Sequence, residues 1–324
     1  MAQTHELMEI GALVVGFGSI GRKHARLLKE VGARVSVVTR SCREVERDSA
    51  YTYFESIGDV NMKEIRYIVI AVETSRHIEC MLNALRLNKR ARIMVEKPLA
   101  AESKQLVDLG LTIEDKERVF IGFNLRYLPV VKKSKELCKQ QDKKFTRAEF
   151  FSHSYLPHWR DIDYRKSSSA RWSTGGGVLR DLSHELDLMQ WLCGTPHKLN
   201  IYGGHLSNLE CEVEDTIYIV GSCKQAGLVS IGLSYTQHFE TRGFSLISNN
   251  ETLVTDLMSG KIIKSSSNGT ELIECPCEDF DDTYRKMHRD IIQEGGGECA
   301  RYIDGQLNIK CIEDLDRELG MHEK

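Results

Sequence analysis

Short apolar runs alternate with amphipathic stretches over residues 1–124. The runs are rich in β-branched residues and nearly continuous, as expected for parallel strands covered on both faces, and they predict strands at 12–15, 34–38, 67–72, 93–95 and 119–121. Between them, residues 20–31 and 77–87 have the apolar spacing of helices, and Gly32 supplies a helix stop. This alternation predicts βαβ units in a doubly wound parallel sheet, an α/β fold.

The pattern changes after Pro129 to a period of two. In residues 227–235, Val229, Ile231 and Leu233 alternate with small or polar residues, which predicts a sheet with one buried face, usually antiparallel. The other predicted strands of this part are 145–152, 199–206 and 215–223. Helices are predicted at about 178–193 and 282–293, the second closing the chain. The sequence therefore predicts two domains, α/β at 1–124 and α+β at 125–324.

Composition and charge narrow the class of protein. The 324 residues are 41% hydrophobic and 28% charged, as in ordinary globular proteins. A net charge of −3 argues against a nucleic-acid-binding protein. Neither a run of about 20 apolar residues nor a signal-peptide pattern is visible, so we expect no membrane span and a cytoplasmic location. The ten cysteines are expected to be reduced, and the Cys275-Pro276-Cys277 pair lacks a second pair at zinc-finger spacing, so no metal site is predicted.

A glycine motif joins the first predicted strand to the first helix. In the stretch LVVGFGSIGRKHARLL, Gly16, Gly18 and Gly21 form G-x-G-x-x-G. Glycines at these positions allow a tight turn, the approach of backbone to a pyrophosphate, and close helix–strand packing, and the helix N-terminus offers free N–H groups. The alternative is an incidental glycine-rich turn. We predict a dinucleotide site that includes Ser19 and Ile20 at the helix start.

The end of the second strand bears on which dinucleotide is bound. NAD-selective proteins usually carry a carboxylate there to bind the ribose 2′-hydroxyl. This chain has Thr39, Arg40 and Ser41 instead, and a guanidinium flanked by hydroxyls suits a 2′-phosphate. NADP is therefore favoured over NAD; the alternative is that Arg40 is a solvated loop charge.

Two further segments carry candidate chemistry. RIMVEKPLA places Lys97 and Pro98 at the carboxyl end of a predicted strand, where ligands of parallel sheets bind; a surface Lys–Glu pair is the alternative. In TGGGVLRDLSHELDLMQWLCG, three glycines precede a helix on which Asp181, His184 and Asp187 recur at i+3 and share one arc. This cluster could orient an imidazole for proton transfer, with the glycines admitting a ligand to the backbone; a polar surface stripe is the alternative.

The glycine motif together with EKPLA, GFNLRYLP and GGGVLRDLSHELD resembles the glucose–fructose oxidoreductase/inositol dehydrogenase family, often written Gfo/Idh/MocA. The resemblance implies an N-terminal Rossmann domain and a C-terminal α+β domain whose open, largely antiparallel sheet often serves oligomer contacts. It places the family's Glu-Lys-Pro motif on Glu96, Lys97 and Pro98, its cofactor-contacting turn on Thr74 and His77, and its helix histidine on His184.

One position departs from the commoner pattern of that family. The family's aspartate four residues before the histidine is replaced by Arg180, and Asp181 lies one residue closer. A helix brings either spacing near the histidine, so the role can survive. The sequence DLSHELD is more similar to a subgroup from bacterial surface-sugar pathways.

The resemblance implies an oxidoreductase that moves a hydride between nicotinamide and a secondary alcohol or ketone of a sugar. His184 is the predicted acid/base, because histidine titrates near 6.5, whereas the pKa of Lys97 would have to fall from about 10.4 to near 7.5, a penalty of roughly 4 kcal/mol. Lys97 would bind and polarise the substrate oxygen, with Asp181 supporting His184. The predicted substrate residues are Asn124, Arg126, Tyr127, Tyr155, Trp159, Arg160, Tyr164, Arg165, Arg171 and Asp187. The alternative function is a dinucleotide-binding sensor without turnover, and a homo-oligomer, dimer or tetramer, is expected in either case.

Overall fold

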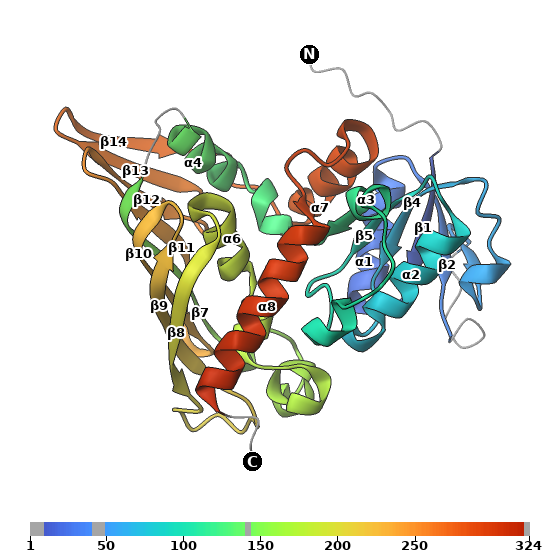
Figure 1. Ribbon diagram of the computed structural model, residues 1–324, viewed down its shortest axis with the longest axis horizontal. Helices are drawn as coiled ribbons and strands as arrows, with labels where there is room; N and C mark the ends of the chain where they lie inside the picture. The colour runs from blue at the N-terminus through green and yellow to red at the C-terminus, as the bar shows by residue number, and fades with distance from the viewer. Residues whose placement is uncertain (1–9, 41–48, 140–143, 321–324) are drawn as a thin grey trace. The chain divides into compact units, whose positions relative to one another are not determined.

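A computed structural model, shown in Figure 1, describes residues 10–40, 49–139 and 144–320 of the chain. Its contacts divide the chain into two units, 1–127 with 279–309, and 128–278 with 310–324. The predicted boundary at 124/125 lies near the first division. A single boundary does not describe the chain, because residues 279–309 return to the first unit.

The first unit is built on a seven-stranded sheet in the order β15-β6-β5-β4-β1-β2-β3. All neighbouring strands are parallel except β15, which runs antiparallel to β6. The strands are β1 Gly11–Val15, β2 Arg34–Val38, β3 Thr52–Phe54, β4 Ile65–Ile70, β5 Arg92–Val95, β6 Val119–Ile121 and β15 Ala300–Arg301. The helices of this unit are α1 Ser19–Glu30, α2 His77–Leu87, α3 Ile113–Glu117 and α7 Phe280–Arg289, which continues as a π-helical turn over Asp290–Glu294.

Both faces of this sheet are buried, which explains the continuous apolar runs. Leu13 belongs to a core on one face with Met81 of α2. Its neighbour Val14 belongs to the core of the other face, with Ala25 of α1 and Met287 of α7. Because successive strand residues point to opposite faces, a strand covered on both sides needs an apolar residue at every position. The predicted doubly wound sheet is confirmed.

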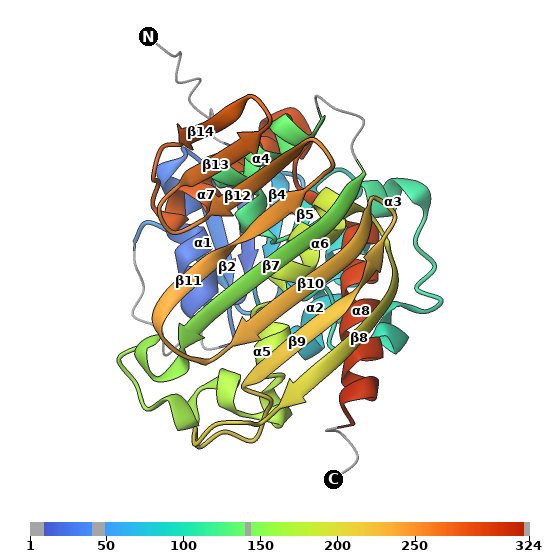
Figure 2. The ribbon, with the colours of Figure 1, turned by 90° about the vertical axis from the view of Figure 1, so that its left-hand side faces the viewer.

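The second unit is built on an eight-stranded sheet in the order β14-β13-β12-β11-β7-β10-β9-β8, seen face on in Figure 2. Neighbours are antiparallel except β7 and β10, which are parallel, so the predicted largely antiparallel open sheet is confirmed. The strands are β7 Phe145–Tyr155, β8 Pro196–Gly204, β9 Thr216–Cys223, β10 Ala226–Ser234, β11 Thr236–Ile247, β12 Glu251–Asp256, β13 Lys261–Ser266 and β14 Gly269–Glu274. The helices are α4 Pro129–Lys139, α5 Val178–Asp181 and α6 His184–Cys193, and α8 Tyr302–Leu319 crosses the division between the units.

One face of the second sheet is buried, as its period of two predicts. Phe150 of β7 lies in register with Ile231 of β10 and Phe244 of β11, and all three are at most 2% exposed. On the other face, Val254, Ile263 and Leu272 stand exposed in a row across β12, β13 and β14.

Local predictions and observed elements differ most near two places. The helix predicted at 178–193 is wrong as one helix, because it is interrupted at Leu182 and Ser183 between α5 and α6. The helix predicted at 282–293 does not close the chain, since α8 follows it.

The short 3-10 helices lie at Ile57–Asp59, Thr74–Arg76, Ser103–Leu106, Asn124–Tyr127, Leu156–His158, Tyr164–Lys166, Ser168–Ala170 and Trp172–Thr174.

Within the described residues, every helix is too short or too polar to cross a bilayer. The nine cysteines in this part of the chain are free thiols, and Cys42 lies outside it.

Candidate functional site

The predicted cofactor residues of the first unit follow the carboxyl ends of its parallel strands. Gly16 follows β1, Thr39 and Arg40 follow β2, Thr74 follows β4, and Lys97 follows β5. Because these strands are neighbours and run in the same direction, their carboxyl ends form one edge of the sheet. The structure thus brings these five residues to the same edge.

Each glycine of the motif has its own physical reason. Gly16 has φ +101°, and a Cβ there would lie 2.3 Å from the Ala71 carbonyl oxygen. A Cβ on Gly21 would lie 2.2 Å from the carbonyl oxygen of Gly16. The helix can therefore pack this closely against the turn only if residue 21 is glycine. By contrast, a Cβ on Gly18 would meet nothing within 4 Å.

Gly18 is the N-cap residue of α1, whose first turn holds no acidic residue. Ser19, which is exposed, and Ile20, which is half-buried, are the first two residues of that helix. An open backbone at a helix N-terminus, free of competing carboxylates, fits the pyrophosphate of a dinucleotide.

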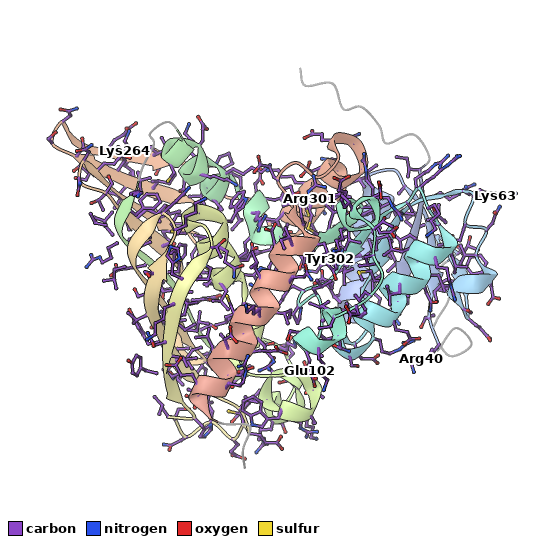
Figure 3. All side chains as sticks on the ribbon, viewed as in Figure 1. Arg40, Lys63, Glu102, Lys264, Arg301 and Tyr302 are labelled. Carbon is purple, nitrogen blue, oxygen red and sulfur yellow. The ribbon has the colours of Figure 1, made fainter. Side chains whose placement is uncertain are left out.

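Arg40 is exposed at the edge of the first unit, as Figure 3 shows. Its guanidinium lies 3.4 Å from a carboxylate oxygen of Glu73, and both side chains are about two-thirds exposed or more, at 68% and 73%. Such a long, solvated ion pair contributes little, so an anionic ligand can replace it. The predicted Ser41 lies outside the described residues.

Glu96 points into the unit rather than toward solvent. It is 8% exposed, one carboxylate oxygen lies 2.8 Å from His24 Nε2, and the other accepts the backbone N–H of Lys97 at 3.1 Å. Lys97 itself is half-buried. The carboxylate therefore fixes the backbone from which the Lys97 side chain extends.

A buried polar chain continues from Glu96 into the core of the first unit. His24 Nδ1 lies 3.0 Å from His288 Nε2, and His288 Nδ1 lies 2.9 Å from the Tyr67 hydroxyl. Both histidines are fully buried. The sequence-based prediction did not include this series of hydrogen-bonded side chains. The one sequence signal for it was the position of His24 on the apolar face of α1, three residues after Gly21.

The pH dependence of stability follows from this chain. Burial, and then the neighbouring His24, lower the pKa of His288 well below 6.5. Above pH 6.5 the imidazole is neutral in both folded and unfolded states; below it, only the unfolded chain takes up a proton. We therefore expect His288 to lower the free energy of unfolding of the first unit as the pH falls from 6.5 toward the folded pKa of this residue. The expected decrease is about 1.4 kcal/mol for each pH unit.

Hydrogen exchange of peptides from β4 and α7, followed by mass spectrometry from pH 7.5 to pH 5, measures this slope. Fluorescence would miss it, because Trp159, Trp172 and Trp191 all belong to the second unit. His288→Gln should flatten the slope by one proton, while the exposed His197→Gln leaves it unchanged. Equal slopes in wild type and His288→Gln would contradict the assignment.

His77, which the resemblance placed in the cofactor-contacting turn with Thr74, is the first residue of α2. It is 1% exposed, with Nδ1 2.8 Å from the Pro98 carbonyl oxygen and Nε2 3.1 Å from the Val72 carbonyl oxygen. Burial lowers the pKa of His77, although the two carbonyls and the Glu96 charge oppose that shift. The ring ties the Lys97-Pro98 segment to the loop after β4, which is a positioning role.

The predicted substrate residues of the first unit are buried. Asn124 is 4% exposed and donates to the Thr283 hydroxyl at 2.8 Å, and Arg126 is 3% exposed and lies 3.3 Å from Asp304. The Tyr127 hydroxyl donates to Asp290. These contacts give the three residues a structural role in joining η4 (Asn124–Tyr127) to the returning segment 279–309.

In the second unit, the helix interruption separates Asp181 from His184. Asp181 ends α5 and accepts a hydrogen bond from the Tyr235 hydroxyl at 2.7 Å, while His184 is half-buried at the start of α6. Asp187 is 1% exposed. The prediction of one polar arc on one helix is therefore wrong for Asp181, and Tyr235 is a partner that the sequence-based prediction missed.

Two of the aromatic residues predicted before the glycines, Tyr155 and Trp159, pack against aromatic side chains at positions 235 and 238. The Trp159 indole N–H donates to Ser154 at 2.9 Å, and its ring packs edge-on against Tyr235 at 5.1 Å. Tyr155 packs on His238 at 4.0 Å between ring centres. Through Tyr235, the loop is thus connected to Asp181.

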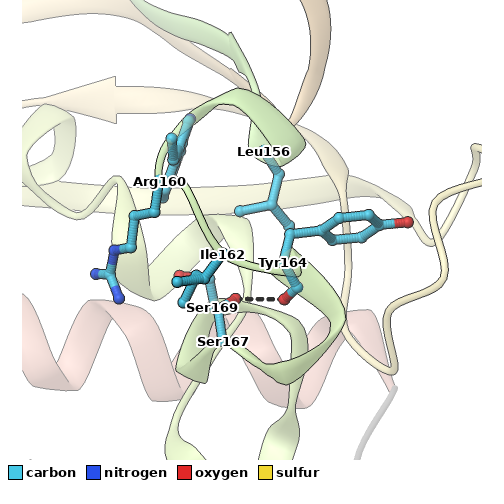
Figure 4. A pocket seen from close by; sticks show the side chains of 7 residues that line it. Leu156, Arg160, Ile162, Tyr164, Ser167 and Ser169 are labelled. Atoms are coloured by element: carbon cyan, nitrogen blue, oxygen red, sulfur yellow. Dashed lines mark hydrogen bonds between the residues drawn. The ribbon is translucent and has the colours of Figure 1, made fainter.

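The arginines of this loop are placed differently. Arg165 is exposed and paired with Asp163 at 2.8 Å and Glu210 at 3.2 Å. Arg160 and Arg171 are also exposed, and Tyr164 accepts the Glu210 N–H at 3.0 Å. Figure 4 shows a small recess in this loop, where the Ser167 hydroxyl donates to the Tyr164 carbonyl oxygen at 2.6 Å. The recess is lined by Leu156, Trp159, Arg160, Ile162, Tyr164, Ser167 and Ser169.

The glycines before α5 pack against their own chain. A Cβ on Gly176 would lie 2.3 Å from the Ser168 carbonyl oxygen, and one on Gly177 would lie 2.4 Å from the Glu214 carboxylate. Burial raises the pKa of Glu214 to about 7, and its carboxylate accepts the Leu179 N–H at 3.1 Å. Close packing explains these two glycines, where the sequence had suggested the approach of a ligand.

Two parts of the chain match known protein families. Residues 10–123 match the family described as "Oxidoreductase family, NAD-binding Rossmann fold", and residues 145–254 match the family described as "GFO/IDH/MocA C-terminal domain". The two matches together span more than half of the chain.

Among curated relatives, inositol 2-dehydrogenase of Salmonella typhimurium is 24% identical over 226 residues, which is 66% of this chain and 63% of that protein. The chain therefore matches less than two thirds of the length of this relative. Among solved structures, UDP-N-acetylglucosamine 3-dehydrogenase from Acidithiobacillus ferrooxidans has a TM-score of 0.77 at 15% identity, covering 96% and 98% of the two chains. Levoglucosan dehydrogenase in complex with NADH and L-sorbose has a TM-score of 0.81 at 14% identity, covering 96% of each.

Proposed function

Since the chain belongs to the GFO/IDH/MocA oxidoreductase family, we propose that it is an NAD(P)-dependent dehydrogenase or reductase acting on a secondary alcohol or ketone of a sugar or sugar derivative. The observation that carries the proposal is the edge of the parallel sheet where the open Gly18 backbone and the half-buried Lys97 occur together. That combination provides a place for a dinucleotide and an ammonium group beside it.

The bound dinucleotide supplies the hydride acceptor or donor at nicotinamide C4. Gly16, Gly18 and the first turn of α1 hold its pyrophosphate. In the direction of oxidation, the Lys97 ammonium binds and polarises the substrate hydroxyl oxygen, and the His184 imidazole accepts the hydroxyl proton. Glu96 acts as a positioning residue, because its carboxylate accepts the Lys97 backbone N–H. In the second unit, Asp181 is proposed to support His184, and Asp187 and Trp159 are proposed to contact the substrate.

The substrate class is supported by the relatives. Their names describe enzymes acting on inositol, on a nucleotide-linked amino sugar and on levoglucosan, all of which are polyhydroxylated rings. The aromatic side chains of Tyr155 and Trp159 would pack against the face of such a ring.

The proposal can be tested by measuring absorbance at the nicotinamide band with a panel of candidate substrates. The panel contains cyclitols, free sugars and nucleotide-linked sugars, each combined with NAD⁺, NADP⁺ and their reduced forms. Turnover with at least one member is expected. The second candidate is a sensor that binds the dinucleotide without turnover. Tight binding by calorimetry with no turnover across the panel, in a protein that stays folded, would favour the sensor and contradict the enzyme.

NADP is the proposed cofactor because Arg40 replaces the carboxylate expected at the end of β2. Arg40→Ala is expected to weaken NADP⁺ binding by about 10-fold to 100-fold, since a charge-assisted hydrogen bond contributes about 1.5–3 kcal/mol, while NAD⁺ binding changes little. Calorimetric titration with both dinucleotides measures the two effects. Arg66→Ala, an exposed arginine of β4, is the matched control. An equal loss for both dinucleotides would contradict recognition of the 2′-phosphate.

Self-association through the second sheet, as a dimer or tetramer, and a cytoplasmic location stay predictions.

A further inference from the structure

The connection between β8 and β9 gathers three side chains of metal-binding type. His205 Nδ1 lies 3.5 Å from the Cys211 sulfur and 3.4 Å from a carboxylate oxygen of Asp215. One ligand atom from each of these residues falls within 4.8 Å of the others. Among the described residues, this is the group of His, Cys, Asp or Glu side chains whose ligand atoms all lie within 4.8 Å of one another.

These separations match the edges of a tetrahedral metal site. Bonds of about 2.0–2.3 Å from zinc to nitrogen, oxygen and sulfur place neighbouring ligand atoms about 3.3–3.8 Å apart. The Val213 carbonyl oxygen adds a fourth atom, 3.2 Å from His205 Nδ1 and 3.7 Å from the Cys211 sulfur. Imidazole, thiolate and carboxylate together favour a borderline-soft cation over Mg²⁺ or Ca²⁺.

The carboxylate of this cluster is firmly held. Asp215 is fully buried, and it accepts hydrogen bonds from the Leu206 N–H at 3.1 Å, the Ser207 N–H at 3.0 Å and the Ser207 hydroxyl at 2.7 Å. Such outer contacts fix a ligating carboxylate in place and are typical of metal sites. His205 and Cys211 are less buried than Asp215, which leaves a path for an ion to enter.

We propose that His205, Cys211 and Asp215 bind a thiophilic divalent cation, Zn²⁺ being the best match, and that the ion fixes the loop between β8 and β9. On binding, the sulfur–hydrogen bond of Cys211 is replaced by a sulfur–metal bond, and the proton passes to solvent. The role is structural, because the Val213 carbonyl oxygen completes the four positions and leaves none open for a substrate.

The loop is connected to the segment that carries the predicted substrate residues. The Glu212 N–H donates to the Ala170 carbonyl at 2.9 Å, and the Glu210 N–H donates to the Tyr164 hydroxyl at 3.0 Å. An ion at this site would therefore stiffen both segments. The proposal does not depend on the enzymatic function, because all of its residues and its test lie apart from turnover.

Titration of the full-length, chelator-treated protein with Co²⁺ tests the site. We expect one equivalent to bind, with a thiolate-to-cobalt charge-transfer band and the intense visible bands of tetrahedral cobalt, and Zn²⁺ to displace it. Cys211→Ala should abolish the charge-transfer band and weaken Zn²⁺ binding at least about 100-fold, a loss at or beyond that seen when only an outer contact is removed. His205→Ala should keep the band but weaken Zn²⁺ binding.

Cys277→Ala is the matched control, because Cys277 is an exposed thiol of the same unit. It should leave both the band and the affinity unchanged. Tryptophan fluorescence confirms that each variant is folded. The proposal is overturned if the folded wild type binds no Co²⁺ or Zn²⁺ stoichiometrically, or if Cys211→Ala retains the charge-transfer band.

Discussion

Replacing His184 with alanine is expected to lower kcat of the proposed dehydrogenase by about 10²-fold to 10⁴-fold, the range that a general acid or base contributes. Histidine ordinarily titrates near 6.5, so the imidazole can accept a proton at neutral pH without a large shift. In the direction of oxidation, wild-type kcat should fall on the acid side as this base becomes protonated. His184→Ala should lose that acid limb, which steady-state kinetics from pH 5 to pH 9 will measure with the substrate that the panel identifies.

Two comparisons separate this role from others. Lys97→Ala should raise KM and lower kcat but keep the acid limb, because the lysine binds and polarises the oxygen without being the base. His197→Ala, an exposed histidine of β8, should behave as wild type. If His184→Ala keeps near-normal turnover, or if Lys97→Ala is the variant that loses the acid limb, the assignment of the base is wrong.

Replacing Arg242 with alanine is expected to destabilise the second unit by about 3–5 kcal/mol. Glu185 of α6 is 1% exposed, and Arg242 of β11 holds its carboxylate at two points, Nε to Oε1 at 2.7 Å and Nη2 to Oε2 at 3.0 Å. Removing the arginine leaves a buried carboxylate without its cation. Urea unfolding followed by fluorescence measures the loss, because Trp191 lies on the same helix as Glu185.

The matched control for this pair is Arg147→Ala on β7. Arg147 and Glu149 form an exposed ion pair at 3.4 Å, which should be worth less than about 1 kcal/mol. A double variant, Glu185→Leu with Arg242→Leu, removes both charges and should recover most of the stability, because well-packed apolar residues often replace a buried pair without loss. Equal destabilisation by Arg147→Ala and Arg242→Ala would contradict the distinction.

Much of the first unit could be predicted from local pattern. The helix at 77–87 and the strands at 34–38 and 119–121 coincide with α2, β2 and β6. Their signals are strong, because strands buried on both faces are continuously apolar and the helices between them keep a clear period. The glycine motif was equally readable, because its spacing between a strand and a helix is local. Gly21 is required by a contact with Gly16 in the same βαβ unit, whereas Gly16 is required by the Ala71 carbonyl oxygen, which follows β4.

The candidate site could be predicted only as a set of positions. Lys97 was found because it follows a strand end, a local feature. Asn124 and Arg126 occupy a similar position but are buried against residues far along the chain, Thr283 and Asp304. Sequence pattern near a strand end does not distinguish a side chain that lines a cleft from one that packs inward.

The sequence by itself determined the doubly wound sheet, the glycine turn and the one-faced second sheet, because each depends on residues that are close together along the chain. Only the tertiary structure decided that His24 meets His288, that Asp181 binds Tyr235 across the break between α5 and α6, and that 279–309 returns to the first unit. Such contacts join residues separated by up to 264 positions. They leave no periodic trace in the sequence, since a buried polar partner is selected by what surrounds it in space and not by its neighbours along the chain.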